Sequence, residues 1–314
     1  MTTFKDRADG VLVGLAAGDA LGAGYEFGPA FDGPVSMIGG GPFGWEPGEW
    51  TDDTQMAICI AEQSAIGNLD LVALGDRFIA WANGANDIGD QTRAVLSAAR
   101  DGDDLPAAAA DRFRLHPRKS AGNGSLMRTG PVALPYLGNP DRIAAAAADI
   151  SALTHADPLA VDACVIWTLA VAEAAESGIV PEVRIGLDYI PIGRRDRWAG
   201  FIDDAETSPP GVFAPNGFVV TAFQAAWSSI VHTPVPEDEP ARHLQNTLEN
   251  AVRIGNDTDT VAAIAGTLLG AVWGASAVPA EWQDVMHGWP GYTASDLKRL
   301  AAQSLAGRPR GAAG

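Results

Sequence analysis

The stretch DTDTVAAIAGTLLGAVWG, from Asp257 to Gly274, decides the fold class because its apolar residues recur at helical spacing. The apolar stripe consists of Val261, Ile264, Ala265, Leu268, Leu269 and Val272. A spacing of three and four residues places these side chains on one face of an α-helix. We therefore expect a helix over this stretch that packs its apolar face into a core.

The same periodicity recurs along most of the chain, whereas alternating strand patterns are scarce. It predicts further helices over 10–27, 70–81, 92–100, 140–153, 158–176, 217–232 and 239–253, with Asp157 as the N-cap of the helix that begins at Pro158. Loops rich in Gly and Pro are expected over 28–48, 116–130, 185–216 and 234–240. We therefore predict an all-α fold, a compact multi-helix bundle forming a single domain over 1–306, followed by a disordered tail over 307–314.

Glycines recur every four residues at Gly14, Gly18 and Gly22, and again at Gly266 and Gly270. In a membrane such spacing would indicate helix dimerisation, but Asp19 and the short apolar length argue against a span. The pattern predicts two helices that pack closely in a core.

Composition restricts the classes of partner. The chain has 314 residues, with 21 Lys and Arg against 39 Asp and Glu, and a formal net charge of −18. Such a surface argues against a nucleic-acid partner, although backbone amides or metal ions could still hold a small phosphorylated ligand. The polar N-terminus shows no signal peptide, and we find no apolar run long enough for a membrane span. We expect a cytoplasmic monomer that does not bind membranes.

The two cysteines, Cys59 and Cys164, cannot form a disulfide framework or a multi-cysteine zinc site. Both lie in apolar stretches of helical character. We expect them to be small buried side chains.

Oxygen-bearing side chains gather immediately before two apolar helices. Thr51, Asp52 and Asp53 precede one helix, and Asp257, Asp259 and Thr260 precede the other. Helix capping explains one such residue per helix, but not two matched clusters of carboxylates. Hard oxygen ligands suit Mg²⁺, Mn²⁺ or Ca²⁺, and a pair of ions would offset the repulsion and could activate water. A dinuclear metal site is the favoured interpretation, and simple capping is the alternative.

Other polar groups lie in loops next to predicted helices. Glu26 follows the first helix, and the glycine-rich turn over 121–130 could hold a diphosphate or a ribose through its backbone amides. His155 precedes a capped helix, and Asp87 and Asp90 lie in a loop. An ordinary turn, a structural histidine and solvated loop carboxylates are the alternatives for these features.

Six motifs occur in an order and at a spacing that identify a resemblance. They are GLAAGDALGAGYEF, GEWTDDTQM, DIGDQTR, GNGSLMR, THADP and GNDTDTVAAIAGTLLGAVWG. Together the motifs resemble the ADP-ribosylglycohydrolase family, and within it the dinitrogenase-reductase-activating glycohydrolase branch, from about Asp6 to Leu305. The resemblance implies a compact all-α fold with a dinuclear Mg²⁺ or Mn²⁺ site.

The resemblance also implies roles for individual residues. The implied metal ligands are Thr51, Asp52, Asp53, Asp257, Asp259 and Thr260. The implied catalytic residues are Glu26, Asp53 and Asp257. The implied substrate-binding residues are Asp87, Gly122, Asn123, Gly124, Ser125, Met127, Arg128, His155, Gly255 and Asn256. Asp87 matches a carboxylate that meets the guanidinium of a modified arginine.

The sequence departs from the family pattern at three places. Ala156 and Asp157 stand where relatives often carry a second histidine, Asn256 stands where many carry glycine, and Phe218 stands where tyrosine is expected. These departures concern the protein substrate and fine ligand contacts rather than the implied metal ligands.

The resemblance implies a metal-dependent hydrolase that cleaves the glycosidic bond between ADP-ribose and an acceptor, with ADP-ribosyl-arginine on a protein as the expected substrate. The acceptor could instead be a small molecule. Alternatives are hydrolysis of an O-linked ADP-ribose such as a serine conjugate or O-acetyl-ADP-ribose, a dinuclear metallohydrolase acting on another nucleotide-sugar, and a non-catalytic ADP-ribose-binding protein.

Overall fold

The computed structural model describes residues 2–67 and 69–307. Within these ranges the chain forms thirteen α-helices, seven short 3₁₀ helices and one two-stranded hairpin. The α-helices are α1 (Phe4–Gly22), α2 (Asp52–Ala65), α3 (Leu71–Ala82), α4 (Asp90–Ala98), α5 (Leu105–Leu115), α6 (Pro140–Ala152), α7 (Pro158–Ser177), α8 (Ile192–Thr207), α9 (Val219–His232), α10 (Arg242–Arg253), α11 (Thr258–Trp273), α12 (Ala280–Val285) and α13 (Ala294–Ala306). The 3₁₀ helices are η1 (Ala23–Tyr25), η2 (Gly102–Asp104), η3 (Pro117–Lys119), η4 (Gly130–Tyr136), η5 (Val183–Tyr189), η6 (Pro210–Phe213) and η7 (Ala275–Ala277), and β1 (His287–Gly288) pairs antiparallel with β2 (Tyr292–Thr293).

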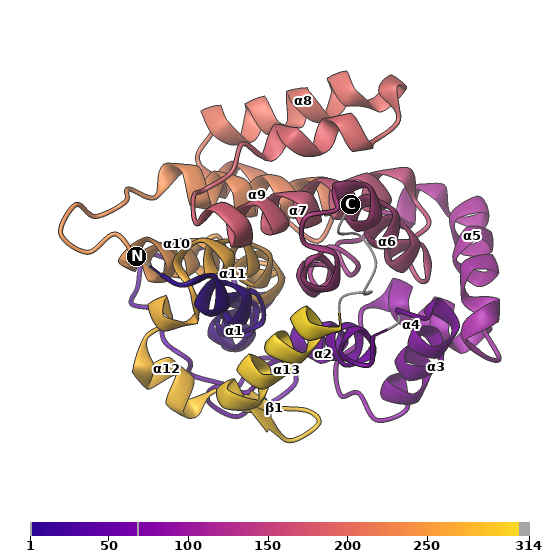
Figure 1. Ribbon diagram of the computed structural model, residues 1–314, viewed down its shortest axis with the longest axis horizontal. Helices are drawn as coiled ribbons and strands as arrows, with labels where there is room; N and C mark the ends of the chain where they lie inside the picture. The colour runs from indigo at the N-terminus through magenta and orange to yellow at the C-terminus, as the bar shows by residue number, and fades with distance from the viewer. Residues whose placement is uncertain (1, 68, 308–314) are drawn as a thin grey trace.

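Helices α1 and α11 lie side by side in the interior (Figure 1). Gly10 meets the backbone of Gly270, and Gly14 meets that of Gly266. Because the contacts run in opposite directions along the two helices, the pair is antiparallel. A Cβ on either Gly10 or Gly14 would lie under 3.0 Å from a backbone oxygen of α11, closer than side chains allow. The glycine spacing therefore serves close packing in the core, as predicted.

Both central helices are buried on all sides rather than on one face. Every residue of α1 from Ala8 to Gly22 is buried, and so is every residue of α11 from Thr258 to Val272. The other helices cover them: α13 packs on α1 and α2, and α9 and α10 pack on α11. In Figure 1, α8 lies outermost on one side, and α3, α4 and α5 form another edge. The antiparallel arrangement brings the end of α1 to the start of α11.

The chain ahead of α2 is fixed by the hairpin near the C-terminus. The Trp50 backbone N–H donates to His287 O at 3.1 Å, and the His287 N–H donates to Gly48 O at 3.0 Å. The indole Nε1–H of the buried Trp50 donates to Trp289 O at 3.1 Å. These bonds hold the residues just before α2 against the hairpin.

The all-α prediction is confirmed, and each predicted helix is found with ends shifted by a few residues, the largest shift being the start of α1 at Phe4. Asp157 caps α7 through Leu159 N–H at 2.8 Å, and both cysteines are buried, as expected. The predicted loop over 185–216 is wrong, because it contains α8. That helix buries only Trp198, Ile202 and Ala205, and so narrow a stripe gives a weak periodic signal. Helices α5, α12 and α13 were also not predicted.

The sequence-based expectation was that no segment is long and apolar enough to span a membrane, and helix α7 does not meet it. By length and composition alone Pro158–Ser177 is apolar enough to cross a membrane, but 78% of its most apolar window is buried inside the molecule. A buried core helix satisfies the same test. The single domain over 1–306 stays a prediction, and the predicted tail, apart from Gly307, lies outside the described residues.

Candidate active site

The N-termini of α2 and α11 meet at the end of α1 and bring the two predicted oxygen clusters together. Thr51 Oγ1 lies 3.3 Å from Asp53 Oδ2 and 3.4 Å from Asp259 Oδ2. Thr260 Oγ1 lies 3.4 Å from Asp53 Oδ2. Neither Thr51 nor Asp257, the two N-cap residues, accepts a capping hydrogen bond with its side chain. Capping therefore does not account for these clusters.

Residue Asp19 of α1 supplies the cap that α2 lacks. Its Oδ1 accepts the backbone N–H of Thr51 at 2.9 Å, and its Oδ2 accepts the Thr54 N–H at 2.9 Å and the Thr54 hydroxyl at 2.6 Å. Asp19 is not among the site residues predicted from the sequence. A single carboxylate in an otherwise apolar stretch was the signal that could have identified it. Because Asp19 caps the helix, Asp52 and Asp53 are left free for other partners.

A cavity of about 480 Å³ opens above the two helix N-termini. Glu26 joins its floor, where one oxygen each of Glu26, Asp257 and Asp259 lie within 4.8 Å of one another. Asp52, Asp87 and Thr260 also line it, whereas Thr51 and Asp53 lie buried outside its lining. The structure thus gathers Glu26 and all six predicted metal-ligating residues in and below one cavity floor.

Burial and mutual repulsion dominate the electrostatics of this floor. Burial, together with the neighbouring carboxylates of Asp87, Asp257 and Asp52, raises the pKa of Glu26 to about 9. Burial likewise raises the pKa values of Asp53 and Asp259 well above their ordinary range. Such carboxylates are stable in a protein when a cation or a proton neutralises them.

Three carboxylate oxygens of the floor are buried without any hydrogen-bond partner: Glu26 Oε2, Asp53 Oδ1 and Asp259 Oδ1. Buried acceptors in native proteins are otherwise almost always paired. A set of carboxylate and hydroxyl oxygens with unused acceptor capacity is the donor set that hard divalent cations prefer. The residues present therefore fit such a cation.

The glycine-rich turn forms one wall of the cavity and fixes Asp257. Asn123 Nδ2 donates to Asp257 Oδ2 at 2.8 Å and to Asn216 O at 3.1 Å. Asn216 Oδ1 in turn accepts the Asp257 N–H at 2.9 Å. Gly122, Gly124 and Met127 line the cavity beside Asn123. Asn216, which was not predicted as a site residue, thus connects Asp257 to the glycine-rich turn.

A buried chain of donors determines the state of His155. Arg128 Nη2 donates to Thr154 Oγ1 at 2.7 Å, and Thr154 Oγ1 lies 2.8 Å from His155 Nδ1. The Thr154 hydroxyl, which accepts from Arg128, has its own proton to donate to Nδ1, and in that arrangement Nε2 carries the imidazole hydrogen. Burial and the Arg128 charge hold the pKa of His155 well below its ordinary value. His155 therefore lines the cavity as a neutral imidazole.

Four predicted substrate-binding residues lie outside the cavity lining. Arg128 is fully buried, with its guanidinium over the Phe78 ring, and Ser125 bonds to Ser151 and Cys164. Gly255 and Asn256 form the bend before α11 with φ angles of 77° and 63°. Asn256, one of the departures from the family pattern, tolerates this left-handed conformation better than most residues.

The rim of the cavity carries residues that sequence reasoning missed. The aromatic side chains of Phe27, which directly follows Glu26, and Phe43 line it. Arg112 of α5 and Lys119 of η3 also line it, and they are its only Lys or Arg side chains among the described residues. No spacing in the sequence pointed to either pair, because both belong to separate exposed segments.

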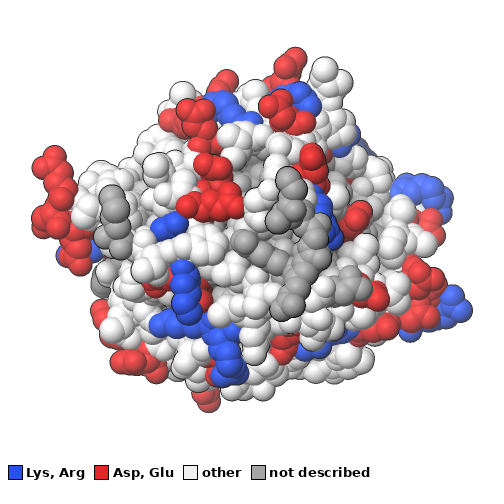
Figure 2. All heavy atoms as spheres, in the orientation of Figure 1, with Lys and Arg blue, Asp and Glu red and all other residues white. Residues whose placement is uncertain are grey.

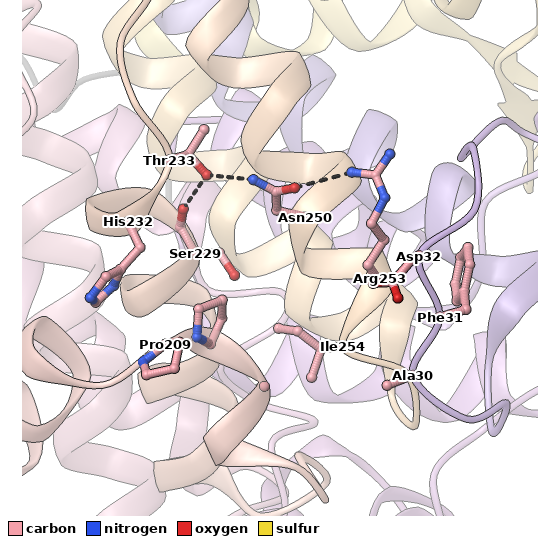
Figure 3. A pocket seen from close by; sticks show the side chains of 12 residues that line it. Ala30, Phe31, Asp32, Pro209, Ser229, His232, Thr233, Asn250, Arg253 and Ile254 are labelled. Carbon is pink, nitrogen blue, oxygen red and sulfur yellow. Dashed lines mark hydrogen bonds between the residues drawn. The ribbon is translucent and has the colours of Figure 1, made fainter.

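A second cavity of about 510 Å³ lies between α9, α10, η6 and the loop over 30–32 (Figure 3). Its side chains satisfy one another: Asn250 Nδ2 donates to Thr233 Oγ1, and Arg253 Nη1 donates to Asn250 Oδ1, each at 3.0 Å. Thr233 Oγ1 donates to Ser229 O at 2.7 Å. Although this cavity is slightly larger, the unpaired carboxylate oxygens make the first cavity the better candidate for chemistry.

The comparisons with known proteins agree with this geometry. The ADP-ribosylglycohydrolase family matches residues 1–313. The chain is 30% identical to the ADP-ribosylarginine hydrolase Tri1 of Serratia proteamaculans over 89% of this chain and 75% of that protein. It is 27% identical to the ADP-ribosyl-[dinitrogen reductase] glycohydrolase of Rhodospirillum rubrum, over 89% and 90% of the two chains. A solved structure described as an ADP-ribosylglycohydrolase-related protein complex superposes with a TM-score of 0.73 and 27% identity, covering 98% and 99% of the two chains.

Proposed function

Because the chain belongs to the ADP-ribosylglycohydrolase family, we propose that it hydrolyses the N-glycosidic bond between ADP-ribose and an arginine side chain of a modified protein. The observation that carries the proposal is the set of unpaired buried carboxylate oxygens of Glu26, Asp53 and Asp259 at one cavity floor. The relatives from Serratia proteamaculans and Rhodospirillum rubrum, named as an ADP-ribosylarginine hydrolase and an ADP-ribosyl-[dinitrogen reductase] glycohydrolase, support the same class of reaction.

The proposed site holds two Mg²⁺ or Mn²⁺ ions. The residues that would hold them are Thr51, Asp52, Asp53, Asp257, Asp259 and Thr260. When bound, such ions supply positive charge that orients ribose hydroxyls and makes water a better nucleophile. Asn123 and Asn216 orient Asp257 for this role through the hydrogen bonds at its carboxylate and backbone.

The remaining steps fall to side chains of the chain itself. Cleavage at the ribose carbon passes through an oxocarbenium-like transition state, which needs a proton transfer at the leaving nitrogen and at the attacking water. Glu26 lies within 4.8 Å of Asp257 and Asp259 and can exchange a proton with a group held above them. We assign proton transfer to Glu26, with Asp53 below the floor as the alternative.

An anionic diphosphate needs local positive potential in a protein of net charge −18. On the face shown in Figure 2, acidic side chains are spread over the surface and basic ones occupy fewer places. Within the cavity, the His155 imidazole N–H, the backbone of Gly122 to Gly124, and the cations Arg112 and Lys119 are the groups suited to a diphosphate. We assign the diphosphate to this part of the lining.

Asp87 is the residue that favours arginine as the acceptor of the ADP-ribosyl group. Its carboxylate lines the cavity near Glu26, and burial raises the pKa of Asp87 to about 6, with the charges of Asp19 and Asp257 adding to the effect. A guanidinium would relieve this repulsion through charge-assisted hydrogen bonds, whereas a neutral serine oxygen would not. An arginine acceptor is therefore favoured over a serine acceptor.

The test is the release of ADP-ribose from matched arginine-linked and serine-linked ADP-ribosyl peptides, each with Mg²⁺, Mn²⁺ or a chelator. We expect metal-dependent cleavage of the arginine conjugate alone. Cleavage of the serine conjugate alone would overturn the role of Asp87. Cleavage of neither peptide, with ADP-ribose still bound, would favour another acceptor or a binding protein. The monomeric state and the cytoplasmic location are proposals to be checked by sedimentation and by cell fractionation.

A further inference from the structure

Phe27 at the mouth of the cavity has an unusual backbone conformation. Its φ is 59°, and Phe27 and Asn256 are the only non-glycine residues with positive φ among those the structure describes. A bulky residue in the left-handed region is strained, and such strain persists only where the surroundings enforce it. Phe27 is also 66% exposed, so burial does not compensate for the strain.

The backbone around Phe27 is held by the segment that precedes α11. The Phe27 N–H donates to Asn256 O at 2.6 Å, and the Asn256 N–H donates to Gly28 O at 2.8 Å. Gly255 packs so closely on Pro29 and Ala30 that a Cβ there would not fit. The two strained residues therefore fix each other, and the Phe27 ring is presented at the cavity directly after Glu26.

Phe43 is a second aromatic side chain at the same mouth. It lies at the tip of a tight turn closed by the backbone pair Gly40 and Trp45, with N–H to O distances of 2.7 and 2.9 Å. The turn packs on η1, because Gly39 O lies against Gly24 and Ala23 O lies against Gly41. Phe43 lines the cavity and is 37% exposed.

The charged residues that line the cavity indicate which kind of ligand the two rings can bind. Glu26, Asp52, Asp87 and Asp90 line the same cavity, whereas its two cations come from α5 and η3. The face of an aromatic ring is electron-rich and attracts a cation, and a planar guanidinium stacks on it particularly well. Rings in a cavity lined by carboxylates therefore favour a cationic partner over an anionic nucleotide.

We propose that Phe27 and Phe43 form, with Asp87, the subsite that binds the guanidinium of the acceptor arginine. The inference rests on the proposed function, and it adds that specificity for arginine is determined by the two rings as well as by a carboxylate. Asp87 accepts hydrogen bonds from the guanidinium edge while a ring covers its face. ADP-ribose itself occupies the rest of the cavity and does not depend on either ring.

The test compares Phe27→Leu and Phe43→Leu with the wild-type protein. Leucine keeps an apolar side chain but removes the aromatic face, so kcat/KM for the arginine-linked peptide should fall by about 3- to 30-fold, mainly through KM. The dissociation constant of ADP-ribose should stay within about twofold, because ADP-ribose has no acceptor. Phe27→Tyr should retain activity, and Phe4→Leu, at the 39% exposed first residue of α1, is the matched control.

Two results would overturn the inference. One is an unchanged KM for the arginine-linked peptide in both leucine variants. The other is a loss of ADP-ribose affinity as large as the loss in kcat/KM, which would make the rings an adenine platform. If the wild-type protein cleaves no arginine conjugate, the proposed function fails, and binding of N-acetyl-arginine amide in the presence of ADP-ribose, followed by ligand-observed NMR, decides the inference alone. Wild-type binding lost in Phe27→Leu would support the subsite, and equal or absent binding in both proteins would refute it.

Discussion

Replacing Gly14 by alanine tests the contact between α1 and α11 directly. A Cβ at Gly14 would lie under 3.0 Å from Gly266 O, and backbone atoms cannot rotate away as a flexible side chain can. Overpacking of this kind costs about 3 kcal/mol at the upper end of its usual range. Alanine returns about 1 kcal/mol through its better helix propensity. We therefore expect the free energy of unfolding to fall by about 2 kcal/mol.

The matched control is Gly200→Ala in α8, where a Cβ would meet nothing within 4 Å. There only helix propensity acts, and the variant should gain about 1 kcal/mol. Urea unfolding followed by circular dichroism should thus separate the two variants by about 3 kcal/mol, with opposite signs relative to wild type. Equal stabilities would show that α1 and α11 do not approach as described. Gly14→Ala should also reduce hydrolytic activity, because the same contact aligns Asp19 with the start of α11.

Three further predictions concern single side chains. Asp19→Asn keeps one acceptor oxygen, which can serve the two Thr54 bonds, but it faces the buried Thr51 N–H with an amide that cannot accept, and the free energy of unfolding by urea should fall by about 2 kcal/mol; an unchanged value would remove Asp19 as the anchor of α2. Asp257→Ala should abolish turnover and the rise in Tm on adding Mn²⁺, with an unchanged far-UV circular dichroism spectrum; retained activity would remove the metal site. His243 is buried, and burial lowers its pKa below 6.5, so below pH 6.5 the unfolded chain binds a proton that the folded one does not, and stability is lost as the pH falls. Between pH 7.5 and pH 5.5, the free energy of unfolding of His243→Gln should therefore fall by about 1 kcal/mol less than that of the wild-type protein, as measured by urea titration. An equal fall in both proteins would contradict a neutral His243.

Sequence periodicity predicted the helices that contribute broad apolar faces, and it failed where a helix contributes a narrow one. Helix α8 buries three side chains, and the predicted loop in its place is the clearest error. The two oxygen clusters were found because carboxylates directly before an apolar run are rare enough to stand out. The two clusters converge because α1 and α11 pair in antiparallel fashion. The glycine spacing predicted that these two helices pack closely, but it did not predict their relative direction.

The supporting residues of the site were harder to find from sequence. Asp19, Asn216 and Phe27 act through contacts with segments far away in the chain, such as the Asn216 bond to Asp257 across 41 positions. Arg128 shows the converse case, because a motif residue beside the glycine-rich turn is buried under His155 rather than open to the cavity. Side-chain direction within a turn depends on packing, which no spacing rule supplies.

The pairing of α1 with α11 also sets the order of events during synthesis. The Thr258 hydroxyl bonds to Gly22 O across 236 positions, so the acidic floor is assembled from segments made at very different times. At about 5–20 residues per second, α1 leaves the ribosome roughly 10 to 50 seconds before its partner. During that interval α1, an apolar helix whose glycines pack on α11 in the folded protein, has no partner helix. A nascent chain released before position 257 would lack Asp257, Asp259 and Thr260, which complete the floor, so such partial translation products should have no hydrolytic activity and should depend on chaperones.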